Sequence, residues 1–370
     1  MAHGNMKKLP EDVVIDILLR LPVKSLMKLK CVSNTWYILI GSSTFINCHL
    51  NSNTVAKEEF ILFKRSFMEE PYRYKTILSF LSGDDDYYLN ALSPDLDVSD
   101  LISTFNSIYD QFIGPCHGLI ALMNILNTIL INPATRNYRL IPPCPFACPP
   151  GFRRDVDCIG FGFDTISNDY KVVRISEIYW DTYYMSPDVR EKKVEVYGLS
   201  FDSWRELEHV GQDLPIVHWM SCSMIFYKVA CHWLAIVGSK MVILCFDMST
   251  ETFRNMILPN TCNYFNGPRY GLVILNESLS MICYPDQDHM SDPAHELMDI
   301  WIMSEYSVYD SWIKKYSIGL LPIDSLLAVW KDYSVLLECD NGHLISCDIK
   351  SGKVKAFNFD GFPKSLRAIT

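Results

Sequence analysis

A turn pattern that recurs along the chain constrains its fold more than any other feature. Asn or Asp is followed by Ser or Thr three residues later, by an apolar or aromatic residue six later, and by Lys or Arg seven later. The four copies are Asn132…Thr135…Tyr138-Arg139, Asp164…Ser167…Tyr170-Lys171, Asp247…Thr250…Phe253-Arg254 and Asp348…Ser351…Val354-Lys355, with looser relatives at Asp202 and Asp310. Each copy lies between two apolar runs. We interpret it as a β-hairpin whose Asn or Asp side chain caps the turn and whose basic residue faces solvent.

Hairpins that return at irregular steps of about 45 residues are typical of a β-propeller. A β-sandwich is the alternative, but six such hairpins are difficult to place in two sheets. We therefore predict a mainly β fold, in which residues 51–370 form a propeller-like, kelch-like body of about six blades. We expect the ring to close by pairing an early strand near residues 60–64 with a late one.

The composition supports a folded, strand-rich chain and excludes some functions. Hydrophobic residues make up 49% of the 370 residues, charged residues 21% and aromatic residues 13%, which favours pleated, half-buried surfaces. The net charge of -10 argues against a nucleic-acid partner, because phosphate contacts need an excess of Lys and Arg. The charge is uneven, since residues 1–50 carry +3 and the remainder carries -13.

The thirteen cysteines are scattered, form no CxxC pair and mostly lie inside apolar runs. This pattern favours free thiols in a reducing compartment over a secreted disulfide scaffold. No signal-peptide core follows the first residues, and no apolar run reaches the roughly 20 residues needed to cross a bilayer. We therefore predict a cytoplasmic protein without a membrane partner.

Residues 1–50 carry the helical signal. Pro10 suits the first position of a helix, and apolar residues at three- and four-residue steps give it a stripe: Val13, Val14, Ile17, Leu18 and Leu21. Pro22 ends this helix, residues 25–32 repeat the pattern, and Ser33 is a plausible N-cap for a third helix carrying Trp36. Three short helices make a very small core, so we expect them to leave an apolar side bare for a partner. The alternative is an amphipathic cap that packs on the chain's own body.

This stretch resembles the F-box. The matching residues are Leu9-Pro10, Ile17-Leu18, Arg20-Leu21-Pro22, Lys24-Ser25-Leu26, Cys31-Val32-Ser33, Trp36, Phe45 and His49-Leu50. The resemblance implies an F-box at residues 1–50 that docks onto the Skp-family linker subunit of a cullin–RING ubiquitin ligase, and reaches the cullin and RING subunits through it. The apolar contacts that it implies are Leu9, Pro10, Ile17, Leu21, Pro22, Leu26 and Trp36.

Residues 51–370 resemble the plant F-box-associated domain, which implies a substrate-recognition domain. The similar runs are residues 114–119, 131–137, 160–164, 170–173 and 202–205, with His232-Trp233. Residues 60–65, 141–146, 241–251 and 292–295 are similar to the S-locus F-box proteins of pollen. That likeness implies binding of non-self S-ribonucleases for ubiquitination in self-incompatibility. The broader alternative is an F-box adaptor for another plant protein.

Motifs for catalysis, cofactors or metals are missing from the sequence. The nine His residues are isolated, His289 and His295 are too far apart for a convincing metal pair, and no nucleophile elbow or phosphate loop is present. We predict no catalytic residues, metal or cofactor, and a role in positioning a target. A propeller enzyme with carboxylates or His converging on its central channel remains the alternative. Four polar insertions are expected to be loops where binding surfaces usually lie: residues 82–107, 142–156, 177–193 and 285–297.

Overall fold

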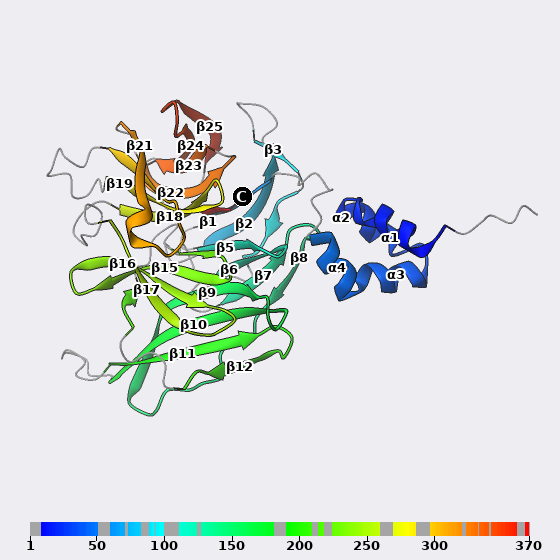
Figure 1. Cartoon of the computed structure of the whole chain (residues 1–370), viewed down its shortest axis with the longest axis horizontal. Helices are drawn as coiled ribbons and strands as arrows, with labels where there is room; N and C mark the ends of the chain where they lie inside the picture. Colours follow the sequence, from blue (N-terminus) through cyan, green and yellow to red (C-terminus); the bar gives the residue numbers. More distant parts are fainter. Residues whose placement is uncertain are drawn as a thin grey trace, which may run out of the picture.

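The computed structural model joins a small helical region to a six-bladed β-propeller (Figure 1). It describes residues 9–50, 60–70, 73–82, 89–92, 94–99, 111–123, 127–180, 190–208, 214–217, 224–259, 269–285, 297–319, 323–331, 333–339, 342–360 and 367–369. The mainly β fold and the six blades confirm the sequence prediction.

The helical region contains four helices: α1 (Glu11–Leu19), α2 (Val23–Leu29), α3 (Asn34–Gly41) and α4 (Ser43–Leu50). Pro10 and Pro22 are the N-caps of α1 and α2, so each proline stands immediately before its helix. The Oγ of Ser33 accepts a hydrogen bond from the backbone N–H of Trp36 at 3.2 Å, which confirms the predicted cap of the third helix. The fourth helix was not predicted. Its first turn is capped in the same way by Ser42, which accepts from the N–H of Phe45.

The strands form six antiparallel sheets that we number as blades in chain order. The first blade is β26 (Arg367–Ile369), β1 (Ile61–Glu70), β2 (Arg73–Ser82) and β3 (Asn90–Ala91), with β4 (Leu96–Asp97) also on β2. The second is β5 (Gln111–Cys116), β6 (Leu119–Met123), β7 (Thr128–Asn132) and β8 (Asn137–Leu140). The third is β9 (Phe152–Asp164), β10 (Asp169–Trp180), β11 (Arg190–Gly198) and β12 (Ser203–Glu206).

The remaining three blades follow the same order from the centre outwards. The fourth is β14 (Met224–Tyr227), with β13 (Ile216–Val217) beside it on β15 (Ala230–Val237), then β16 (Lys240–Asp247) and β17 (Phe253–Ile257). The fifth is β18 (Arg269–Leu275), β19 (Ser278–Tyr284), β20 (Met298–Met303) and β21 (Trp312–Ile318), preceded by a 3-10 turn, η4 (Tyr309–Ser311). The sixth is β22 (Ile323–Trp330), β23 (Ser334–Cys339), β24 (His343–Asp348) and β25 (Val354–Asp360).

Ring closure joins the two ends of the propeller sequence. Strand β26 pairs antiparallel with β1, with Leu62 opposite Ile369 and Phe63 opposite Ala368. Around the centre, β26, β5, β9, β14, β18 and β22 contact one another, so the late strand is the innermost strand of the first blade. The predicted pairing of an early strand near residues 60–64 with a late one is confirmed.

The recurring Asx pattern marks hairpins, as predicted. Asn132, Asp247 and Asp348 each accept a hydrogen bond from the backbone N–H three residues later, at 3.0, 2.8 and 2.7 Å. These three turns join the third and fourth strands of their blades, and the looser copies at Asp202 and Asp310 lie at the equivalent connections of two other blades. The copy at Asp164 differs, because it joins the inner strands β9 and β10.

Lys171 contradicts the expectation that the basic residue of the pattern faces solvent. Because its hairpin is an inner one, Lys171 is buried between the third and fourth blades. Its Nζ lies 2.8 Å from carboxylate oxygens of both Asp164 and Glu251, and donates to the carbonyl of Met248 at 2.8 Å. Burial opposes ionisation of Asp164, but hydrogen bonds from Lys171, Ser167 and Ser249 hold the pKa of that carboxyl well below its usual range.

Several predicted loops are shorter than expected. Strand β9 begins at Phe152, β10 continues to Trp180 and β11 begins at Arg190, so parts of the predicted loops at 142–156 and 177–193 are strands. The polar residues of this ribbon alternate between exposed and half-buried positions, which is a strand pattern that polarity alone conceals. The predicted loop at 82–107 contains β3 and β4. Residues 181–189 and 286–296, with His289 and His295, lie outside the described residues.

The described cysteines are all free, as expected, and seven of them are buried. None of the described helices is long and apolar enough to cross a membrane. Within the described ranges, no three His, Cys, Asp or Glu side chains gather closely enough to hold a metal ion.

Candidate partner-docking surface

The four helices enclose a core of only four buried apolar side chains. Leu18, Leu26, Ile40 and Phe45 contribute one residue from each helix, and half-buried residues pack around them: Val14, Leu19, Leu21, Leu29, Trp36 and Leu39. Helix α4 is tied to the α1–α2 turn because a ring nitrogen of His49 lies 2.9 Å from the carbonyl oxygen of Leu21. The core is therefore complete but small, and it holds the outward-facing side chains in place.

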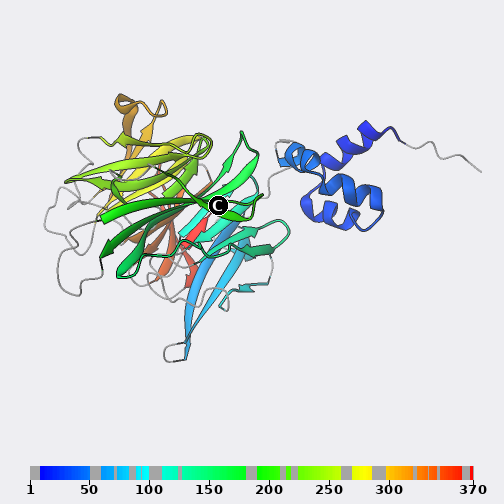
Figure 2. The same cartoon turned by 90° about the horizontal axis from the view of Figure 1, so that it is seen from below.

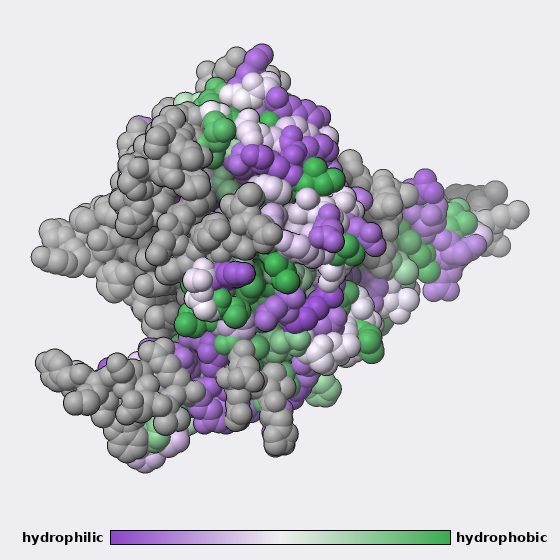
Figure 3. Space-filling view, turned by 60° about the vertical axis from the view of Figure 1, so that its left-hand side comes forward, coloured by the Kyte–Doolittle hydropathy of each residue, from purple (hydrophilic) through white to green (hydrophobic). Residues whose placement is uncertain are grey.

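An apolar row remains outside this core. Val13 and Ile17 are four residues apart and therefore lie on one side of α1, and Leu9 lies just before the helix. All three are exposed, Leu9 by 61% and Ile17 by 47%. Val14 and Leu18 point inwards from the same helix. Figure 3 shows hydrophobic residues exposed among hydrophilic ones on the helical region. The apolar stripe expected for α1 is thus divided between an inner and an outer side.

The predicted contact residues fall into three groups. Leu9, Pro10, Ile17 and Pro22 are exposed. Leu21 and Trp36 are half-buried against the helical core. Leu26 is only 4% exposed and is part of the core itself, so it supports the surface from beneath and presents little area to a partner.

The sequence argument missed further exposed apolar residues of the helices. They are Val13, Met27, Val32, Tyr37, Ile38, Ile46 and Leu50. Tyr37 and Ile38 directly follow Trp36 and face away from the core, being 60% and 67% exposed. The available signal was the run of five apolar residues in α3, which is too apolar for a helix that buries only one side.

Helix α4 connects this region to the propeller. The Nδ2 of Asn47 donates a hydrogen bond to Oδ1 of Asn168 in the β9–β10 turn at 3.3 Å. Leu50 lies against Gly118 in the β5–β6 turn, where an added Cβ would be 3.0 Å from the Leu50 side chain. We call the end of the propeller that carries these turns the helix-side face. In Figures 1 and 2 the other helices stand clear of the blades, so the propeller leaves their exposed apolar residues uncovered.

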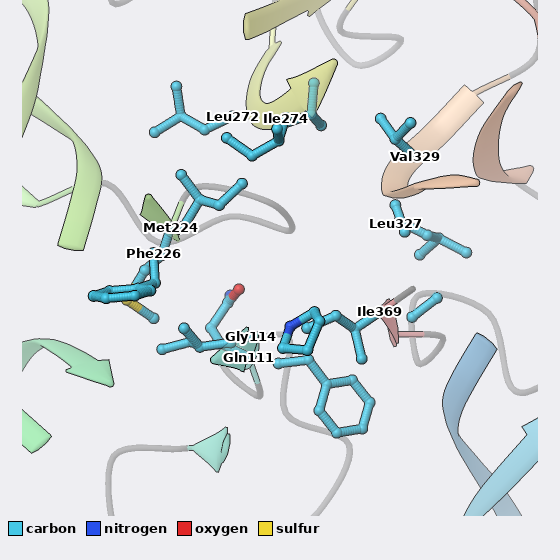
Figure 4. Close-up of a pocket in the computed structure, with 16 residues that line it drawn as sticks. Gln111, Gly114, Met224, Phe226, Leu272, Ile274, Leu327, Val329 and Ile369 are labelled. Carbon is cyan, nitrogen blue, oxygen red and sulfur yellow. The ribbon is translucent and has the colours of Figure 1, made fainter. Parts of the chain in front are cut away.

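A cavity of about 220 Å³ lies where the inner strands meet (Figure 4). Residues of β5, β14, β18, β22 and β26 form its wall, including Met224, Leu272, Leu327 and Ile369. Its described lining side chains are apolar apart from the amide of Gln111, and none is ionisable. The described residues that line this cavity thus include no carboxylate or histidine side chain.

Comparison with known proteins agrees with this architecture. Residues 6–47 match the model of the F-box domain, and residues 87–366 match that of the F-box associated beta propeller domain. The helical region and the propeller thus define the class of F-box proteins that carry an F-box associated propeller. The chain belongs to the F-box associated beta propeller family.

Individual relatives align over most of the length of both chains, but their sequence identity is low. "F-box protein CPR1" of Arabidopsis thaliana is 26% identical over 390 residues, which cover 98% of this chain and 87% of the relative. "F-box/kelch-repeat protein At3g23880" of the same plant is 27% identical, covering 90% of this chain and 86% of the relative. Among solved structures, TolB from Acinetobacter baumannii aligns with 88% of this chain and 70% of its own at a TM-score of 0.46 and 11% identity.

Proposed function

We propose that this protein is the substrate-recognition adaptor of a Skp–cullin–F-box ubiquitin ligase. The observation that carries the proposal is the apolar surface that the small helical core and the propeller both leave exposed on the F-box helices. An exposed apolar area on a small domain is typical of a surface that a partner covers. Leu9, Pro10, Ile17 and Pro22 would contact the linker subunit directly, while Leu21, Leu26 and Trp36 would hold that surface in shape.

The propeller would act by positioning a bound target. Binding of a target places its lysines near an activated ubiquitin carried by other subunits, so the rate gain comes from proximity and no catalytic group is required of this chain. We propose that targets bind at the end of the propeller opposite the helix-side face, where β10 and β19 end at Trp180 and Tyr284. The cytoplasm is the compartment that we propose, because the described thiols are free.

Docking is tested by charge substitution at an exposed apolar position. We expect Ile17→Asp to abolish co-purification of the full chain with the linker subunit, since a carboxylate would lose its water at the contact. The matched control is Ile166→Asp, because Ile166 is 79% exposed in a propeller turn outside the docking surface. Circular dichroism would confirm that both variants keep their fold. Unchanged capture of Ile17→Asp would refute docking through this surface.

We propose non-self S-ribonucleases of the style as the target class, which makes this a pollen self-incompatibility protein. The support is the similarity of residues 60–65, 141–146, 241–251 and 292–295 to the S-locus F-box family. Residues 181–189 and 286–296, which follow β10 and β19, add six carboxylates in sequence and would attract a basic protein.

A panel of allelic S-ribonucleases immobilised separately tests the target. We expect the full chain, in complex with its linker subunit, to retain some alleles and not others. Equal failure with every allele, while linker binding persists, would reject the S-ribonuclease target and leave the adaptor role intact. Purification from pollen, followed by identification of the bound proteins, would then find the actual target.

A further inference from the structure

Three side chains from two blades meet on the helix-side face. Lys228 lies in the β14–β15 turn, Arg254 is the second residue of β17, and Tyr306 lies in the connection between β20 and β21. The Nζ of Lys228 is 4.9 Å from the centroid of the Tyr306 ring, and the Cζ of Arg254 is 5.2 Å from the same centroid. One aromatic ring therefore holds two cations.

The backbone at this place is strained. Lys228 and Val229 have φ angles of 45° and 64°, and Ser307, next to Tyr306, has a φ of 69°. A two-residue turn with both φ angles positive normally uses Asn-Gly, and a β-branched residue there is a true outlier. Two strained segments thus converge on one ring, and such strain concentrates at functional sites.

Hydrogen bonds fix the ring and the guanidinium. The Tyr306 hydroxyl oxygen lies 2.7 Å from Nε2 of His232, within hydrogen-bond distance, and accepts a hydrogen bond from Nη2 of Arg254 at 2.8 Å. His232 can accept because burial lowers its pKa to about 4, which keeps the imidazole neutral. The Nη1 of Arg254 also donates to Oγ of Ser307 at 3.1 Å. The cluster is therefore organised before any ligand arrives.

The two positive charges are not balanced within the described residues. Neither Lys228 nor Arg254 forms an ion pair there, although Glu277 and Glu305 lie in neighbouring turns. Both side chains are exposed, so their charges face solvent, whereas the buried Lys171 and the half-buried Lys193 lie within ion-pair distance of carboxylates. Lys228 also lacks a hydrogen-bond acceptor in the part of the chain that the structure describes.

We propose that Lys228 and Arg254, organised by Tyr306 and Ser307, bind a phosphate monoester. A guanidinium and an ammonium offer two charges and several free N–H donors, which match a phosphate dianion better than a single carboxylate. The source is a phosphorylated residue of a protein that binds the helix-side face, separate from the targets proposed for the opposite end, or a soluble phosphate. Phosphate binding by the propeller therefore goes beyond the proposed adaptor function and does not depend on linker docking.

Titration of the full chain tests the site. Inorganic phosphate, a short phosphoserine peptide and its unphosphorylated form would be added in low-chloride buffer, with binding followed by calorimetry and ³¹P line broadening. We expect Lys228→Gln and Arg254→Gln each to weaken phosphate binding at least about tenfold, as loss of a charge-assisted hydrogen bond does. Arg254→Lys keeps the positive charge but removes the paired N–H donors of the guanidinium. It should therefore give an intermediate loss of phosphate affinity.

Lys331→Gln is the matched control, because Lys331 lies 4.8 Å from the Trp330 ring in an equivalent turn of the sixth blade. This variant should bind phosphate as the parent does. Tighter binding of the phosphopeptide than of inorganic phosphate would identify a protein source, and equal binding a soluble one. The proposal is overturned if the parent does not bind phosphate at millimolar concentration, or if all variants bind equally. Linker capture by each variant shows separately whether the adaptor role holds.

Discussion

At the scale of single residues, buried charges hold neighbouring blades together. Lys171 extends from the third blade to Glu251 in the fourth, and Ser249 of the fourth blade donates to Asp164 in the third at 2.6 Å. Arg205 adds a further contact to Glu251 from the outer strand β12. A buried charge that loses its partner destabilises strongly, so this cluster should be sensitive to single substitutions.

The first prediction concerns Lys171. Lys171→Met should lower the free energy of unfolding by about 3 kcal/mol, because it leaves the Asp164 and Glu251 carboxylates without their shared cation. Urea unfolding of the full chain measures the change. The control is Arg139→Met, whose ion pair with Asp202 is exposed and should cost at most about 1 kcal/mol. Similar losses of unfolding free energy in both variants would contradict the conclusion that Lys171 joins the third and fourth blades.

The second prediction concerns pH and His232. Burial lowers the pKa of His232 to about 4, so between pH 6.5 and 4 the unfolded chain binds a proton that the folded chain does not. Stability therefore falls as the pH falls through this window, by on the order of 3 kcal/mol. Loss of ionised Asp164 belongs to a lower window, below about pH 4. Urea midpoints from pH 4.5 to 7 should show a smaller slope for His232→Asn than for the parent. Equal slopes for the two proteins would contradict the contribution assigned to His232.

At the scale of elements, local chemistry predicted the hairpins well. An Asn or Asp side chain that caps its own turn needs only the next three residues, so the pattern could be found in the sequence and confirmed in four turns. Blade position depends on the whole ring, which is why the inner position of the Asp164 turn was not predicted. Helix α4 was missed because its eight residues contain only a weak apolar pattern, with Phe45 alone fully buried.

The third prediction tests the closing strand. Ile369→Asp should destabilise the chain by about 3 kcal/mol or more, because Ile369 is 8% exposed and packs between β1 and the second blade. Ile257→Asp is the matched control, since Ile257 is 55% exposed on the outer strand β17 and should change stability by about 0.5 kcal/mol at most. If the two urea midpoints agreed, β26 would not be needed for closure.

At the scale of the whole molecule, the hydrophobic core of the helices and that of the propeller are built from separate residues. Among the described residues, the buried cluster of the helices contains no propeller residue, and the contacts at the junction are those of α4 with two turns. The F-box could be recognised from its sequence because its turns and caps are local. The exposed apolar surface of the helices was predicted only in part, since the same helical stripe supplies both Leu18 inside and Ile17 outside, and only three-dimensional packing separates them.

The fourth prediction follows from this separation. A chain without residues 1–50 should unfold at nearly the same urea concentration as the full chain. Its free energy of unfolding should change by at most about 1 kcal/mol, because among the described contacts it loses one exposed hydrogen bond and the Leu50 contact. Tryptophan fluorescence would follow the transition, because buried tryptophans such as Trp233 lie in the propeller. A large drop in the midpoint would show that the helices stabilise the blades, contrary to this expectation.

The innermost strand of the first blade also has a consequence for biosynthesis. The helices leave the ribosome before the propeller strands, whereas the ring stays open until residues 367–369 have been translated. A nascent or prematurely terminated chain would then have folded F-box helices but an open propeller that cannot hold a target. A nonsense codon just before Arg367 would yield a polypeptide that occupies linker subunits unproductively, so such an allele should act dominantly.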